Sequence, residues 1–343
     1  MTAAILAAFV ALFLVIGLGF DFCYLNFRPK AEPELQLNSA GYYEADTSTS
    51  QPVPYGTIAA LLIGLGMAVN SMMNGPAMVL RSTMARRAVS MNEKEKQLMN
   101  VVEEMATAAG IPAPAVYVVP DPDLNAFATG TNPSNSVIAV TEGLLNALNR
   151  EELQGVVAHE MSHIRNYDMR LLTVSAALIG AIGLISDFAG RTMRGSRSFS
   201  GGNSSSSSSS GSGSKKGLGP LMLAVFVIWA LLVVFAPLLS RLLAMAISRE
   251  REYLADASGA ELTRNPLSLV SALEKIRGAV NPTYAINNGV AHMCIADPRG
   301  SLIEEKAGFA ADLLATHPPM QKRILALKVM AYQNSGKGAA VGA

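Results

Sequence analysis

Four long runs without charged side chains interrupt this chain and predict its architecture. They cover residues 1–20, 56–80, 171–186 and 217–240. A helix that crosses a bilayer needs about 20 apolar residues, so the first, second and fourth runs predict transmembrane helices. The third run is short, and it predicts either a span or a buried or re-entrant helix. A cleaved signal peptide is the alternative for the first run, but no basic residue precedes it and Phe20-Asp21-Phe22 is no small-residue cleavage site.

Two soluble stretches, 81–170 and 241–343, carry helical and strand patterns instead. In the first we expect a helix over 92–109, strands over 115–119, 126–129 and 136–140, and a helix from Thr141. Asn149 followed by Glu152 is a capping-box pattern, which predicts the start of another helix. The order of helix, short strands and helix is typical of a small α+β unit placed between membrane helices.

These patterns divide the chain into seven segments. We expect an N-terminal transmembrane hairpin over 1–80 with an external loop at 21–55 and a first part of the soluble domain over 81–170. A third apolar helix over 171–190, a Ser/Gly-rich flexible linker over 191–216 and a fourth transmembrane helix over 217–247 follow. A second part of the soluble domain over 248–330 and a flexible tail over 331–343 complete the chain.

Basic residues predict the orientation of the chain in the membrane. The second run is followed by five of them, at Arg81, Arg86, Arg87, Lys94 and Lys96. By the positive-inside rule, the 81–170 segment lies in the cytoplasm. The linker over 191–216 is also basic, however, and it would lie outside if both flanking helices cross the membrane. The sequence leaves open whether the third and fourth runs span fully.

Composition narrows the class of protein. Hydrophobic residues make up 50% of the 343 residues and charged residues only 15%, against about 25% charged in typical soluble domains. A net charge of +1 gives no electrostatic case for a nucleic-acid partner. The two cysteines, Cys23 and Cys294, lie far apart and predict neither a disulfide framework nor a thiolate metal site.

The helix after Asn149 carries the sequence His159-Glu160-Met161-Ser162-His163. Positions i and i+4 share one face of a helix, so two imidazoles can bind the same zinc ion. Glu160 can then take a proton from the water that the metal activates. A chance match of five residues is the alternative. The apolar residues on both sides of the motif predict a buried helix, however. Ionisable groups in such a helix are costly unless they are paired or bound to metal.

A hydrolytic zinc site needs a third protein ligand. His292 and His317 are two candidates, and a carboxylate is another. Glu252 and Asp256 stand at i and i+4 after the fourth apolar run. Glu252 can complete the metal shell, and Asp256 can hydrogen-bond a ligand histidine from behind. The alternative is an ordinary charged helix end, which is how we interpret Glu250.

Several spaced motifs together resemble the HtpX-type membrane zinc metalloproteases, which are related to the CAAX prenyl proteases. They are HEMSHIRNYDM, SREREYLADASGAEL, the NAFATG stretch over 125–130, VTEGLL over 140–145 and THPP over 316–319. The resemblance covers roughly residues 94–327. It implies one Zn²⁺ per chain on His159, His163 and Glu252, with Glu160 as general base and Asp256 behind a ligand.

The resemblance also implies substrate or transition-state contacts from His317, Arg323 and Asn125. A turn residue before Pro318 is the alternative for His317. NAFATG matches a segment beside the active-site cleft, where an extended substrate could add to the sheet edge. The long 21–55 loop and the Ser-rich linker depart from the family pattern.

The fold class that we expect is therefore mainly α and integral to the membrane, with about four transmembrane helices. An α+β zincin-like catalytic domain with a small β-sheet completes it. The resemblance implies a multi-pass protease of a prokaryotic cytoplasmic (inner) membrane that degrades misfolded or damaged membrane proteins in quality control and stress response. A processing protease for one substrate and an inactive scaffold that binds unfolded protein are the alternatives. The lipid bilayer is an expected partner, and the oligomeric state stays open.

Overall fold

The computed structural model describes part of the chain. It covers residues 2–27, 35–37, 43–45, 53–179, 249–279, 283–286, 290–296 and 318–341. These residues fall into two compact units, and the boundary between them lies after residue 68, inside a helix.

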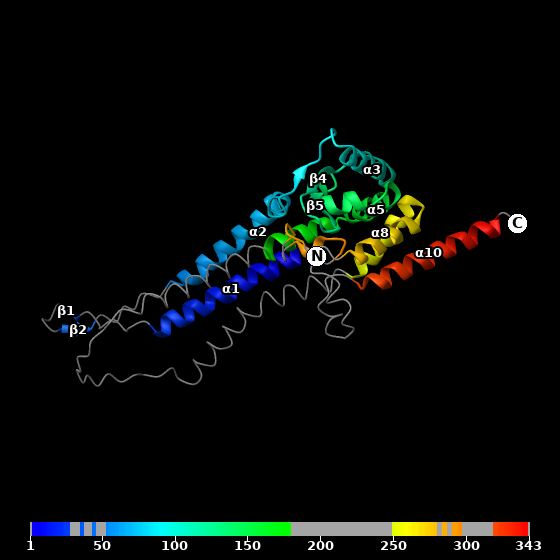
Figure 1. The fold of residues 1–343 in the computed structure, drawn as a ribbon. Coiled ribbons are helices and arrows are strands. Elements are labelled where there is room, and N and C mark those ends of the chain that lie inside the picture. Colours follow the sequence, from blue (N-terminus) through cyan, green and yellow to red (C-terminus); the bar gives the residue numbers. More distant parts are fainter. Residues whose placement is uncertain are drawn as a thin grey trace, which may run out of the picture. The chain divides into compact units, whose positions relative to one another are not determined.

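The first unit contains two long apolar helices, α1 (Thr2–Phe27) and the first half of α2 (Tyr55–Ser82). Of the described helices, these two are long and apolar enough to cross a membrane (Figure 1). The fourth predicted span lies outside the described residues, and only 171–179 of the third run is described, as part of a helix over 168–179. The described residues thus contain two candidate membrane helices of the about four that the sequence predicts, and the fourth stays a prediction.

The loop that we expected over 21–55 is shorter in the structure. Helix α1 continues through Phe27, and the short strands β1 (Leu35–Leu37) and β2 (Tyr43–Ala45) pair antiparallel within the loop. Asp21 does not end the helix because its carboxylate is hydrogen-bonded. It accepts from the backbone N–H of Gly56 at 2.8 Å and of Thr57 at 2.7 Å, which caps the start of α2.

The second unit is built around a four-stranded mixed sheet in the order β3-β4-β6-β5. The strands are β3 (Arg86–Arg87), β4 (Ala115–Val119), β5 (Ala126–Asn132) and β6 (Asn135–Thr141). Strands β4 and β6 are parallel, whereas β5 and β6 form an antiparallel hairpin. The three strands predicted from the sequence are therefore present, and the second is longer than expected.

Both faces of this sheet are buried. On one face Ile138 and Val140 join the main core with the helices, and on the other Phe127 and Ala139 join a second core. Because side chains alternate along a strand, a sheet covered on both faces reads as a nearly continuous apolar run. Such burial gives the rigid platform on which the catalytic helix lies.

Helices cover the sheet and begin and end at residues with clear signals. They are α3 (Glu93–Ala109), α4 (Glu142–Ala147), α5 (Arg150–Arg165), α8 (Pro266–Gly278), the short η1 (Ala291–Met293) and α10 (Met320–Val341), with a further helix over 249–263. Asn92 caps α3, which ends at Gly110 in the left-handed conformation (φ 68°). The Asn149–Glu152 capping box opens α5, as predicted.

Helix α5 lies at the centre of the second unit and packs against α3, α8 and β5 (Figure 1). The other difference from the sequence prediction is at the C-terminus. Helix α10 continues through Val341, where we expected a flexible tail from 331.

Candidate metal centre

Helix α5 presents His159 and His163 on one face. Both side chains are buried, and their ring centroids are 4.8 Å apart with the planes nearly perpendicular, at 88°. The helix is buried from Glu152 to Ile164 except for Gln154, so neither histidine points into bulk water. The H-E-x-x-H spacing thus gives the paired imidazoles that the helical period predicts.

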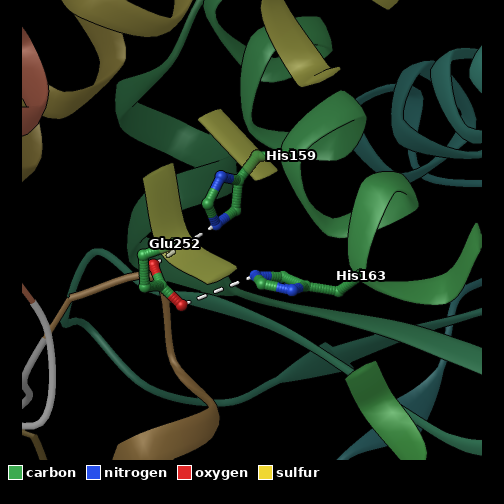
Figure 2. A group of neighbouring side chains, drawn as sticks. All are labelled: His159, His163 and Glu252. Atoms are coloured by element: carbon green, nitrogen blue, oxygen red, sulfur yellow. Dashed lines mark ion pairs between the residues drawn. The ribbon is translucent and has the colours of Figure 1, made fainter. Parts of the chain in front are cut away.

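Glu252 reaches the two histidines from the helix over 249–263, far along the chain. Its Oε2 lies 3.7 Å from His159 Nε2, and its Oε1 lies 3.5 Å from His163 Nε2. Figure 2 shows the carboxylate facing both rings. One ligand atom from each of the three residues lies within 4.8 Å of the others, which is the spacing of a single metal-binding cluster.

A glycine allows this helix to approach α5 so closely. A Cβ at Gly259 would lie 3.0 Å from the backbone nitrogen of His159 and 3.1 Å from its Cα. Any larger side chain would push the two helices apart, and Glu252 would move away from the histidines with its helix. This close backbone contact therefore positions Glu252, the third donor, beside the two histidines.

Each histidine has a carboxylate behind it. His159 Nδ1 lies 2.9 Å from Asp256 Oδ1, and His163 Nδ1 lies 3.4 Å from Asp168 Oδ2. Contacts at Nδ1 leave the Nε2 atoms of both rings facing Glu252, as in the outer shells of protein metal sites. The sequence predicted Asp256 at this place, but it did not single out Asp168, which follows His163 across a turn.

Arg323 contacts residues that lie behind the donor atoms of the site. Its side chain is fully buried, and its Nε and Nη2 donate to the two Asp256 oxygens at 2.8 and 2.7 Å. Its Nη1 donates to the Ile295 carbonyl at 2.8 Å and lies 3.3 Å from Glu252 Oε2. We expected a substrate contact at this residue, whereas in this structure its guanidinium holds Asp256 behind His159 and lies beside Glu252.

Asn125 is also turned into the protein. Its side-chain amide donates to the Ala296 carbonyl at 3.1 Å and to Asp123 at 3.2 Å. The β5 edge beside it is paired: Phe127 bridges to Cys294, and the Ile295 N–H donates to Ala126 O at 2.9 Å. The start of the edge that we expected an extended substrate to use is thus bonded to the chain itself. His317 lies outside the described residues.

His292 and Cys294 matched no catalytic motif, and both lie away from the cluster of donors. His292 is buried, and its Nε2 lies 3.3 Å from the Leu172 carbonyl. It is therefore on the sheet-edge segment rather than among the cluster of donors. Cys294 is a free, buried cysteine on the same segment.

Glu160 is buried beside the cluster. Burial raises the pKa of its carboxyl, although His159 and His163 act in the opposite direction. Its Oε2 has no hydrogen-bond partner among the described residues. A buried carboxylate oxygen left without a partner is costly, and such atoms concentrate at functional sites.

The charges around the cluster favour a cation. Burial lowers the pKa of His163, but the Asp168 and Glu252 carboxylates outweigh it and raise that pKa to about 10. Burial raises the pKa of Asp256, but Arg323 more than compensates, so the pKa is lowered and Asp256 stays ionised. Two imidazole nitrogens and one carboxylate oxygen are donors that a divalent ion such as zinc accepts. The residues present therefore fit a metal.

Buried histidines on an H-E-x-x-H helix with a glutamate from a second helix are the arrangement of a metalloprotease, and comparison with known proteins agrees. Residues 92–331 match the sequence profile of peptidase family M48. The chain belongs to this family, and it is accordingly a hydrolase that uses a metal to cleave peptide bonds.

Relatives with high coverage are bacterial proteases. The chain is 40% identical over 292 residues to the protease HtpX homolog of Streptococcus equi subsp. equi, which covers 85% of this chain and 90% of the relative. It is 42% identical over 275 residues to the protease HtpX homolog of Streptococcus gordonii, with 80% and 86% covered. The crystal structure of S. mikatae Ste24p aligns at 17% identity and a TM-score of 0.44, over 78% of this chain and 57% of that one.

Proposed function

We propose that this chain is a membrane-bound zinc endopeptidase that cleaves misfolded or damaged membrane proteins. In this proposal one zinc ion per chain is held by His159, His163 and Glu252. The observation that carries the proposal is the convergence of three buried ligand atoms, all within 4.8 Å of one another.

Zinc, when bound, supplies a Lewis acid that polarises a peptide carbonyl and lowers the pKa of a water molecule. The protein supplies the base. Glu160 follows His159 on α5, and its carboxylate accepts a proton from the attacking water and delivers it to the leaving amine. Its burial favours this role, because a raised pKa makes a carboxylate a stronger base near neutral pH.

The residues behind the donor side chains hold those side chains in position. Asp256 holds Nδ1 of His159, and Arg323 fixes Asp256 through two hydrogen bonds. A ligand ring that cannot rotate offers its Nε2 at a constant position. The surrounding burial shields these groups from bulk water.

Two apolar helices support the membrane location in this proposal. Helices α1 and α2 are long enough to span a bilayer, the last turn of α2 holds Arg81, and Arg86 and Arg87 follow the helix. The positive-inside rule then puts the catalytic domain in the cytoplasm of a bacterial cell, as part of a multi-pass inner-membrane protein. From that position its substrates would be loops and ends of membrane proteins that have lost their fold.

Cleavage assays on the full chain in detergent test this function. The protein is purified with a chelator present, zinc is then added, and hydrolysis of an unfolded substrate such as casein is measured. We expect zinc-dependent cleavage that Glu160→Gln abolishes. The matched control is Glu151→Gln on the same helix, because Glu151 is exposed to solvent. Cleavage that persists in Glu160→Gln, or that does not depend on zinc, would contradict the assignment.

The substrate class needs a separate comparison. A membrane protein and a destabilised variant of it are reconstituted with the protease in the same vesicles. The proposal expects the destabilised variant to be cleaved at several sites and the stable protein to be spared. Cleavage of both at one defined position would support the alternative of a processing protease.

A further inference from the structure

A second carboxylate–arginine pair lies behind the other histidine of the cluster. Asp168 Oδ2 is 3.4 Å from His163 Nδ1, and Asp168 Oδ1 accepts a hydrogen bond of 2.8 Å from Arg251 Nη1. The Asp168 side chain is only 10% exposed. This arrangement repeats the one at His159, where Asp256 is held by Arg323.

The backbone is bent to bring Asp168 into this place. Helix α5 ends at Arg165, and the next helix starts at residue 168 after a two-residue turn. Tyr167 in that turn has a φ of 60°, one of three non-glycine residues with positive φ among the described residues. A left-handed conformation is unfavourable for tyrosine, and such residues persist where the surrounding structure requires them. Here the turn returns the chain so that the carboxylate faces back toward His163.

Arg251 connects this carboxylate to the third donor. It directly precedes Glu252 on the helix over 249–263, so its bond to Asp168 links the Glu252 helix to the end of α5. The pair thus touches both protein segments that supply the metal donors.

We propose that Asp168 and Arg251 are a positioning pair for the metal centre, in which Asp168 fixes the ring and tautomer of His163 and Arg251 fixes Asp168 against the Glu252 helix. This inference rests on the proposed metal site and adds two residues to it. A carboxylate at Nδ1 holds the proton there and leaves the lone pair of Nε2 for the metal. Neither residue of the pair touches the substrate.

The two positioning pairs differ in the geometry of their contacts with histidine. The Asp168–His163 contact of 3.4 Å is at the long end of hydrogen bonding, whereas the Asp256–His159 contact is closer, at 2.9 Å, but lacks hydrogen-bond geometry at His159 Nδ1. Loss of an outer-shell partner typically lowers metal affinity by about 10- to 100-fold. We therefore expect Asp168→Ala to lower zinc affinity about tenfold.

Zinc affinity itself is the measurement that tests this pair. Full-length protein in detergent carries Glu160→Gln so that it cannot digest itself, and zinc is titrated against a chromogenic chelator. The variants are Asp168→Ala, Asp168→Asn, Arg251→Gln and Arg251→Lys. Thermal unfolding of the zinc-free protein reports stability separately, and cobalt absorption reports the geometry of the donors. The control is the exposed ion pair Arg150–Glu104, tested as Arg150→Gln and Glu104→Gln.

The positioning role predicts weaker zinc binding and an altered cobalt spectrum in Asp168→Ala and Arg251→Gln. Arg251→Lys should restore part of the affinity, and the control variants should bind as the parent does. In the double variant of Asp168→Ala and Arg251→Gln the losses should not add, because Arg251 acts through Asp168. Unchanged zinc affinity and spectrum with lower thermal stability would overturn the proposal and leave a structural tie only. If the parent protein binds no zinc, the proposed function fails instead, so the two failures are distinguishable.

Discussion

At the scale of single residues, buried charged side chains lie behind the donor atoms of the metal cluster. Arg323 is fully buried, and its side chain bonds to Asp256 and to the Ile295 carbonyl. An uncompensated charge in such a place is costly, so each member of the group depends on the others. Because of this dependence, a positioning role for Arg323 and a role in binding substrate predict different effects of substitution.

Arg323→Lys tests that difference. Lysine keeps the charge but cannot make the paired hydrogen bonds to Asp256. We expect zinc affinity and kcat to fall together, with KM for a peptide substrate nearly unchanged. A substrate-binding arginine would give a higher KM and an unchanged zinc affinity. Arg323→Met leaves Asp256 buried without its partner, and it should lower the free energy of unfolding by about 3–5 kcal/mol, measured by denaturant titration.

At the scale of elements, the position of the Glu252 helix depends on its contact with α5. An added Cβ at Gly259 would lie 3.0 Å from the His159 nitrogen, so the backbone of α5 would have to move by a few tenths of an ångström. The sequence predicted the two histidines from helical spacing, because that relation is local. Residue spacing alone left Glu252 as one of several third ligands, because the packing of distant helices does not follow from local spacing, and only the family resemblance singled it out.

Gly259→Ala should therefore weaken the site although alanine is the better helix former. The clash with backbone cannot be relieved by a rotamer change, and overpacking of this kind costs about 1–3 kcal/mol. We expect lower zinc affinity and a lower melting temperature. The matched control is Gly278→Ala at the end of α8, where a Cβ would meet nothing within 4 Å. It should be neutral or stabilising, and equal behaviour of the two variants would argue against the close-contact explanation.

The start of α5 is held by Glu152, which also ties it to α8. Its carboxylate accepts from the Asn149 N–H in the capping box, from Ser271 at 2.7 Å and from Lys275 at 2.6 Å. Burial raises the pKa of Glu152, but these donors outweigh it and the pKa lies below the ordinary value of about 4.5. Because this pKa is lower in the folded protein than in the unfolded chain, the ionised carboxylate stabilises the fold above the ordinary value of 4.5. The stabilisation is lost as the pH falls through the lowered pKa of the folded protein.

Glu152→Gln should lower the free energy of unfolding at pH 7 by about 1–3 kcal/mol, because buried donors lose a charged acceptor. The difference from wild type should shrink in acid, as the pH falls below 4.5 and through the lowered pKa, where the wild-type carboxyl is protonated as well. Thermal unfolding of both proteins at the two pH values measures it. Glu151→Gln on the exposed side of the same helix serves as control. A difference that grows in acid would contradict a lowered pKa for the Glu152 carboxyl.

At the scale of the whole molecule, a peptidase domain is joined to two candidate membrane helices. Apolar runs predicted these two helices well, because length and hydropathy suffice for that. The left-handed turn at Tyr167 and the inward direction of Arg323 could not be predicted in the same way. Both depend on contacts between segments far apart in sequence. Outer carboxylates were therefore foreseen only at Asp256, whose spacing from Glu252 is helical.

The orientation of the chain can be tested by labelling in a Cys23→Ser background, since Cys294 is buried. Met91 is 95% exposed and follows α2, whereas Val53 precedes α2 and is 48% exposed. In intact spheroplasts a membrane-impermeant maleimide should label Val53→Cys but not Met91→Cys. Lysis should expose both. The reverse pattern would place the catalytic domain outside the cytoplasm.

Zinc bound per chain is the most direct measurement of the central claim. Full-length protein is loaded with zinc, freed of excess metal and assayed for metal and protein content. One zinc per chain is expected in the wild type and in Glu160→Gln, because Glu160 acts as a base and not as a ligand. Glu252→Ala and His163→Ala should lose it under the same conditions. Full retention of zinc by Glu252→Ala, with wild-type affinity, would contradict the proposed site, because Glu252 could not then be the third ligand.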